Sequence, residues 1–229
     1  MKKVFLLVGF LVFIAGCDES SLGTQNSVKS REMLAASDGI KLSYSFVGAG
    51  SNAVILLHQL NSGKSAYAGF QEHLREDGFS SIAIDFRGHG DSDGEWQKFT
   101  EKDFKNMILD AEAAKAFLEG KGKKVVGIAG ASIGANIAGQ MTVKYGIKAV
   151  LLSPGLNYRG IDFGGTIPKL KDALIVVSNE DAYSVETAEK AKEENANIKF
   201  LFLENRGHGT DMLDEELEEE MAGFFEERK

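Results

Sequence analysis

Short apolar runs alternate with amphipathic stretches along most of this chain, and this alternation constrains the fold more than any other feature. The runs are apolar at nearly every position, which is typical of strands buried on both faces of a parallel sheet. The stretches between them are long enough to form crossover helices. We therefore expect a mixed α/β domain, with buried strands at residues 53–57, 81–85, 124–129, 149–152, 173–177 and 199–203.

The segments around these strands have recognisable patterns of their own. Residues 32–36 and 41–47 flank Asp38-Gly39 and predict a β-hairpin. Helices are expected over residues 65–77, from 100 to about 118, over 133–145, 184–194 and 214–227. In the second of these, Thr100 is expected to cap the helix with Asp103 at its third position. His73 in the first helix is expected to be solvated.

The last expected helix carries an acidic run. Glu218, Glu219 and Glu220 are consecutive and lie between the apolar residues Leu217 and Met221. A partner surface is one interpretation of this run. The simpler interpretation, which we favour, is a solvated helix face with all three glutamates outward.

The first sixteen residues predict a signal peptide. A basic head, Met1-Lys2-Lys3, precedes an apolar stretch over residues 4–16. Thirteen helical residues reach only about 20 Å, less than the hydrocarbon core of a bilayer. The stretch ends in Ile14-Ala15-Gly16-Cys17 and resembles the lipobox of bacterial lipoproteins. The resemblance implies export and a lipid-anchored Cys17 on the extracytoplasmic face of a membrane.

The polar residues that follow Cys17 suit a flexible tether over residues 17–31. Asp18 resembles an inner-membrane retention signal. Cys17 is the only cysteine, so the chain cannot form an internal disulfide. Acidic residues outnumber basic ones by 34 to 26, which argues against nucleic-acid binding. Without repeats or a second domain, residues 32–229 are expected to form one acidic domain.

The strand at residues 124–129 runs through Gly130-Ala131-Ser132-Ile133-Gly134 directly into a helix. This is the arrangement of a nucleophile elbow, in which small residues around the serine allow a tight turn that exposes its Oγ. The N–H of Ile133 then lies at a helix N-terminus, where it can bind an oxyanion. Ser132 is therefore the candidate nucleophile, and Ser153 is the next candidate.

A serine hydroxyl needs a general base, and only His208 follows the elbow in the sequence. It comes just after the last strand, so it is expected at the same sheet edge as Ser132. The orienting acid should follow the strand at 173–177. Asp181 is preferred to Glu180 because it lies four residues past the strand, while Asp162 and Asp211 are weaker candidates. The order Ser132, Asp181, His208 matches a known triad order.

Together these features resemble the α/β-hydrolase superfamily across residues 32–229. The match includes Leu56-Leu57-His58, the elbow, Asp181, His208 and the run Asp85-Phe86-Arg87-Gly88-His89-Gly90-Asp91-Ser92. The resemblance implies an eight-stranded, mostly parallel sheet with the second strand antiparallel. It also implies that the N–H of Leu60 completes the oxyanion hole, although Gln59 stands where the family usually has glycine. Only residues 157–171 lie where relatives carry a cap, so no sizeable cap is expected.

Other classes of function were weighed against this one. Residues 58–65 match the spacing of a phosphate-binding P-loop except that His58 replaces its first glycine. Asp91-Ser92-Asp93-Gly94 lacks the later glutamate of a calcium loop, so no metal site is predicted. A non-catalytic binding lipoprotein on a hydrolase fold is a further alternative. The favoured hypothesis is a serine hydrolase of small carboxylic esters, which requires no cofactor.

Overall fold

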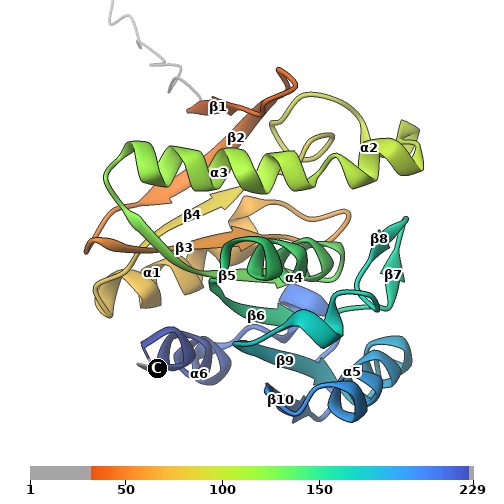
Figure 1. Cartoon of the computed structure of the whole chain (residues 1–229). Coiled ribbons are helices and arrows are strands. Elements are labelled where there is room, and N and C mark those ends of the chain that lie inside the picture. The colour runs from red at the N-terminus through yellow and green to blue at the C-terminus, as the bar shows by residue number, and fades with distance from the viewer. Residues whose placement is uncertain (1–31, 227–229) are drawn as a thin grey trace, which may run out of the picture. The chain divides into compact units, whose positions relative to one another are not determined.

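The computed structural model describes residues 32–226 (Figure 1). The predicted signal peptide at residues 1–16, the lipidated Cys17, Asp18 and the tether up to residue 31 lie outside the described residues. So do residues 227–229. Among the residues that are described, no helix has both the length and the apolar character needed to cross a membrane.

Eight strands form one mixed sheet in the order β1-β2-β4-β3-β5-β6-β9-β10. Strand β2 runs antiparallel to β1 and β4, and the other neighbouring pairs are parallel. The predicted hairpin and the antiparallel second strand are therefore confirmed. The strands are β1 (Met33–Ala35), β2 (Lys41–Val47), β3 (Asn52–Leu57), β4 (Ser80–Ile84), β5 (Lys124–Ala131), β6 (Lys148–Leu152), β9 (Ala173–Ser178) and β10 (Ile198–Leu203).

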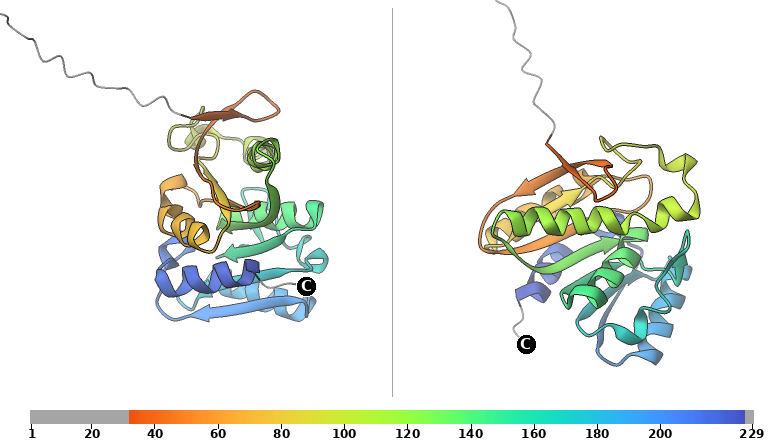
Figure 2. Two further views of the ribbon diagram at one scale, coloured as in Figure 1. Left: turned by 90° about the vertical axis from the view of Figure 1, so that its left-hand side faces the viewer. Right: turned by 45° about the horizontal axis from the view of Figure 1, so that its top comes forward.

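Helices cover both faces of the sheet, as the apolar strands require. Alternate residues of β3 show this directly: Ile55 and Leu57 belong to the core cluster shared with α3 and α4, whereas Val54 and Leu56 pack with α1 and α6. Figure 2 shows these two pairs of helices on opposite sides of the sheet. The helices are α1 (Ala68–Glu76), α2 (Glu101–Lys105), α3 (Ile108–Gly120), α4 (Ile133–Tyr145), α5 (Ala182–Glu194) and α6 (Glu215–Glu226).

The helix expected from Thr100 to about Leu118 is two helices, α2 and α3. Its predicted start is confirmed, because Thr100 and Asp103 form a reciprocal capping box. Between α2 and α3 the backbone hydrogen bonds join residues three positions apart instead of four. The Met107 N–H donates to the Phe104 carbonyl at 3.0 Å, and the Asp110 N–H donates to the Met107 carbonyl at 3.1 Å. Apolar periodicity continues through this change of spacing, so it gave no sign of the break.

Two expectations about surface charge were wrong. Glu218 is only 8% exposed, and its Oε2 lies 2.7 Å from Nδ1 of His73. The two side chains meet because α1 and α6 lie side by side on the same face of the sheet. His73 is therefore a half-buried partner of Glu218 rather than a solvated residue, and only Glu219 and Glu220 of the acidic run are exposed.

Within residues 32–226, no sizeable cap covers the sheet, as expected. Residues 157–171 form a small antiparallel hairpin, β7 (Asn157–Tyr158) and β8 (Ile161–Asp162), followed by a 3₁₀ helix (Ile167–Lys169). Asn136 of α4 holds the base of this hairpin: its Nδ2 donates to the Gly155 carbonyl at 2.8 Å and to the Ile161 carbonyl at 2.9 Å. The hairpin is thus fixed to the helix that begins at the elbow.

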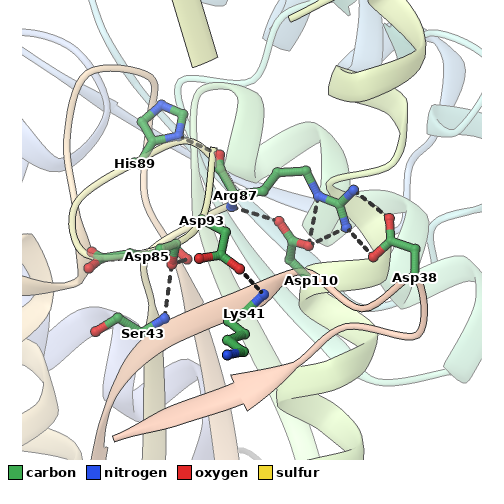
Figure 3. A network of polar contacts seen from close by, with 9 residues as sticks. Asp38, Lys41, Ser43, Asp85, Arg87, His89, Asp93 and Asp110 are labelled. Carbon is green, nitrogen blue, oxygen red and sulfur yellow. Dashed lines mark hydrogen bonds and ion pairs between the residues drawn. The ribbon is translucent and has the colours of Figure 1, made fainter. Parts of the chain in front are cut away.

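Arg87, in the segment after β4, joins the first hairpin to α3 (Figure 3). Its guanidinium lies between two carboxylates, with Nη1 2.7 Å from Asp38 Oδ2 and Nε 2.9 Å from Asp110 Oδ1. The Arg87 N–H also donates to Asp110 Oδ2 at 2.9 Å. Hydrogen bonds from Arg87 hold the pKa of Asp38 below its usual value. Arg87 is thus a structural residue, because its guanidinium is held between a buried carboxylate of α3 and a carboxylate of the hairpin turn.

Candidate active site

Ser132 lies on a strained turn between β5 and α4. Its φ of 54° and ψ of −117° are in a region that residues with a side chain rarely adopt. Neighbouring glycines make the turn possible: a Cβ at Gly130 would lie 2.2 Å from the Gly134 carbonyl oxygen, and one at Gly134 would lie 2.4 Å from that of Leu57. The predicted elbow geometry is therefore present, with Ser132 at its apex.

His208 and Asp181 are brought together from the segments after β10 and β9. Nδ1 of His208 lies 2.6 Å from Oδ2 of Asp181. Burial opposes ionisation of Asp181, but hydrogen bonds from Ser184 and His208 outweigh it and hold the pKa of this carboxyl below its usual value. The His208 side chain is 39% exposed and that of Asp181 is 14% exposed, so the pair lies at the surface edge of the site.

The turn of Ser132 and the segment of His208 lie close together. The Ser132 N–H donates to the carbonyl of Leu152, the last residue of β6, at 2.8 Å. Oγ of Ser153, the residue after Leu152, accepts the Gly209 N–H at 3.0 Å. A methyl group at Gly209 would lie 3.3 Å from the Cβ of Ala131. Ala131 and Gly209 therefore lie close together, and each is the chain neighbour of a predicted catalytic residue.

The other acid candidates have different partners. Glu180 Oε1 accepts the N–H of Gly207 at 2.7 Å, and Asp162 Oδ1 accepts that of Gly165 at 3.2 Å. Asp211 lies in the 3₁₀ helix Gly209–Met212, where its N–H donates to the His208 carbonyl at 3.2 Å. Among the residues that the structure describes, Asp181 is the acid that pairs with the His208 ring.

The segment after β3 is held in place by a buried imidazole. His58 Nε2 accepts the Phe86 N–H at 3.0 Å, which puts the ring proton on Nδ1, 2.6 Å from the Gln59 carbonyl oxygen. Leu60 follows, partly buried against the core. The second predicted oxyanion donor, Ile133, is the first residue of α4, where the backbone N–H has no hydrogen-bond partner within the helix. The oxyanion roles of the Leu60 and Ile133 amides stay predictions.

His58 is expected to make the fold sensitive to mild acid. Burial lowers its pKa from 6.5 to about 4. Between these pH values the unfolded chain binds a proton that the folded chain does not, so stability falls as the pH drops from 6.5 to 4, by about 3 kcal/mol for this group. In urea unfolding at several pH values, the His58→Asn variant should show a shallower decline over this window. An unchanged slope would mean that folded His58 takes up its proton at an ordinary pH.

Lys64, which would be the lysine of a P-loop, is paired with a carboxylate of its own chain. Its Nζ lies 2.6 Å from Asp85 Oδ2, and its backbone N–H donates to Asp85 Oδ1 at 2.7 Å. The same carboxylate accepts the Asp91 N–H at 3.1 Å. A buried Asp85 therefore organises residues 63–65 and 90–91 internally, which argues against the phosphate-binding alternative. The part of the chain that is described also contains no group of three potential metal ligands.

Sequence reasoning missed residues that complete the site. Gln59 Oε1 accepts the N–H of Thr210 at 2.6 Å, so a side chain of the β3 segment holds the segment that carries His208. Tyr158 of the β7–β8 hairpin interacts with the Ser132 hydroxyl, while burial raises the pKa of its phenol. No motif marks Tyr158, because its position depends on how the short hairpin folds back. Gln59 was visible only as a departure from the usual glycine.

An eight-stranded sheet with this order, an elbow after β5 and an acid–histidine pair after the last two strands together define an α/β-hydrolase fold. A family model described as serine aminopeptidase, S33, matches residues 49–194. The chain therefore belongs to this family of α/β-hydrolases. No curated protein matches it in sequence.

Solved structures share the fold at low sequence identity. The esterase PF2001 from Pyrococcus furiosus is 21% identical, with a TM-score of 0.70 over 85% of this chain and 88% of that chain. The esterase EaEST from Exiguobacterium antarcticum is 18% identical, with a TM-score of 0.69 over 85% and 99%. Est1E from Butyrivibrio proteoclasticus, solved with ferulic acid bound, is 18% identical, with a TM-score of 0.70 over 85% and 97%.

Proposed function

We propose that this protein is a serine hydrolase that cleaves small carboxylic esters through an acyl-enzyme intermediate. The observation that carries the proposal is the 2.6 Å contact between His208 and Asp181, taken together with a serine on a strained strand–helix turn. A hydroxyl becomes a useful nucleophile when a base with an oriented ring removes its proton. The three side chains lie after β5, β9 and β10, which are parallel and end at one edge of the sheet.

In the proposed reaction, Nε2 of His208 accepts the proton of Ser132 as Oγ attacks the acyl carbonyl. The amides of Ile133 and Leu60 stabilise the oxyanion. The intermediate then collapses, and the departing alkoxide takes the proton from His208 and leaves as the alcohol. Water repeats these steps on the acyl-enzyme and releases the acid. Asp181 fixes the proton of the neutral ring on Nδ1 and stabilises the imidazolium.

Small substrates are proposed because residues 157–171 form a short hairpin rather than a cap. A site without a cap has little apolar surface with which to cover a long acyl chain. Several structures that share the fold are named esterases, which supports ester substrates. We further propose that the enzyme is exported and held at a membrane by a lipid on Cys17, as its N-terminal sequence indicates.

Labelling with a fluorophosphonate tests the proposal most directly, because this probe phosphonylates only an activated serine. We expect the wild-type chain to be labelled at Ser132, as located by peptide mass spectrometry, and heat-denatured protein to remain unlabelled. A binding lipoprotein on the same fold would give no specific labelling. Labelling at another serine would assign the nucleophile elsewhere.

The family description names an aminopeptidase, which makes peptide amides the second candidate substrate class. Matched aryl substrates distinguish the two: p-nitrophenyl esters of short fatty acids against p-nitroanilides of amino acids. The proposal expects turnover of the esters and little or none of the anilides. Faster cleavage of the anilides would reassign the chain as a peptidase while leaving the Ser132 mechanism intact.

A further inference from the structure

The backbone around His208 is held by side chains from three other strand ends. The Arg206 N–H donates at 2.9 Å to Oγ of Ser178, the last residue of β9. The Gly207 N–H donates at 2.7 Å to Oε1 of Glu180, two residues after β9. The Gly209 N–H donates to Ser153 Oγ at 3.0 Å, just after β6. The position of the His208 ring therefore depends on side chains outside its own segment.

Gln59 supplies the contact from β3. Its Oε1 accepts both the N–H of Thr210 at 2.6 Å and the Thr210 hydroxyl at 2.8 Å. Its Nε2 approaches the His208 carbonyl oxygen at 3.4 Å. Gly209 leaves room for this side chain, because a Cβ there would lie 2.4 Å from Gln59 Oε1. The amide side chain of Gln59 thus spans the residues on both sides of Gly209.

The backbone of Gln59 is fixed as well. Its carbonyl accepts the Nδ1–H of His58, whose other ring nitrogen accepts the Phe86 N–H. Leu60, the proposed oxyanion donor, is the next residue. The Gln59 side chain, next to the proposed oxyanion donor Leu60, is therefore hydrogen-bonded directly to the segment that carries the proposed base, His208. The hydrogen bond from His58 holds the backbone that supports this side chain.

We propose that Gln59 is a positioning residue that holds the His208 ring in the place from which it takes the proton of Ser132. The inference rests on the proposed function and deepens it. A shift of about 1 Å in a catalytic group can lower the rate about 100-fold, which is the scale on which such a contact acts.

The experiment compares Gln59→Ala and Gln59→Glu with wild type, using the full chain in detergent. Gln59→Ala should lower kcat for a short-chain aryl ester by about 10- to 100-fold with KM within about twofold, and should slow fluorophosphonate labelling by the same factor. Glutamate keeps an oxygen for both Thr210 donors, so kcat should recover to within about fivefold of wild type.

Gln71→Ala is the matched control. Gln71 is a buried glutamine of α1 whose amide donates to the Ser45 carbonyl at 3.2 Å, away from the histidine segment. Both alanine variants should lose some thermal stability, but only Gln59→Ala should lose kcat. Equal losses in the two variants, or wild-type kcat and labelling in a folded Gln59→Ala, would overturn the inference. Absence of Ser132 labelling in the wild type would instead refute the proposed function itself.

Discussion

Replacing Ser132 with alanine is expected to lower kcat/KM for a short-chain aryl ester by about 10⁴- to 10⁶-fold. The side chain stands at the apex of the elbow, with φ of 54°, and an alanine there keeps the turn while removing the oxygen atom that is proposed to attack the ester. Binding and the oxyanion amides should survive, so the residual rate stays above that of water. Initial rates with p-nitrophenyl acetate, together with loss of fluorophosphonate labelling, measure the effect.

Ser153 supplies the control for this prediction. It is the next candidate nucleophile, but its side chain is fully buried and its Oγ accepts the Gly209 N–H at 3.0 Å. Ser153→Ala should therefore reduce activity only through the histidine segment and leave labelling of Ser132 detectable. If Ser132→Ala kept wild-type turnover and Ser153→Ala abolished it, the nucleophile would have been assigned to the wrong strand end.

The core of the fold could be predicted because its signals are local. Continuous apolar runs located the six predicted strands, and Asp38-Gly39 located the turn of the first hairpin. The expected burial was wrong for one of the six: β10 is at the edge of the sheet, where only one neighbouring strand covers it, and Phe202 is 45% exposed. The elbow could be found for the same reason: Gly130 and Gly134 are needed for close backbone approach, and their spacing is visible in the sequence. Each of these features depends on residues that are neighbours in the chain.

The features that could not be predicted depend on partners far apart in sequence. His73 and Glu218 are 145 positions apart, and amphipathic patterns say nothing about which polar side chains meet when α1 and α6 become neighbours. Gln59 and Thr210 are 151 positions apart. A long-range polar contact leaves no periodicity in the sequence, so the packing of the helices and strand ends had to be known first.

The sequence favours Asp181 over Glu180 as the orienting acid, and a pair of isosteric substitutions should test this preference. Asp181→Asn is expected to lower kcat/KM about 10⁴-fold, because the amide N–H₂ facing Nδ1 favours the tautomer with its proton on Nε2. That ring cannot accept a proton from Ser132. The 2.6 Å contact between Asp181 Oδ2 and His208 Nδ1 is the geometric basis of the prediction.

Glu180→Gln is the matched variant, because glutamine keeps an oxygen for the Gly207 N–H that Glu180 accepts at 2.7 Å. Its activity should stay within about tenfold of wild type, since only a surface charge is lost. Thermal unfolding of both proteins separates catalytic loss from instability. If Glu180→Gln lost more activity than Asp181→Asn while both remained folded, Glu180 would be the residue that orients His208, and the pairing in this structure would not be the one used in catalysis.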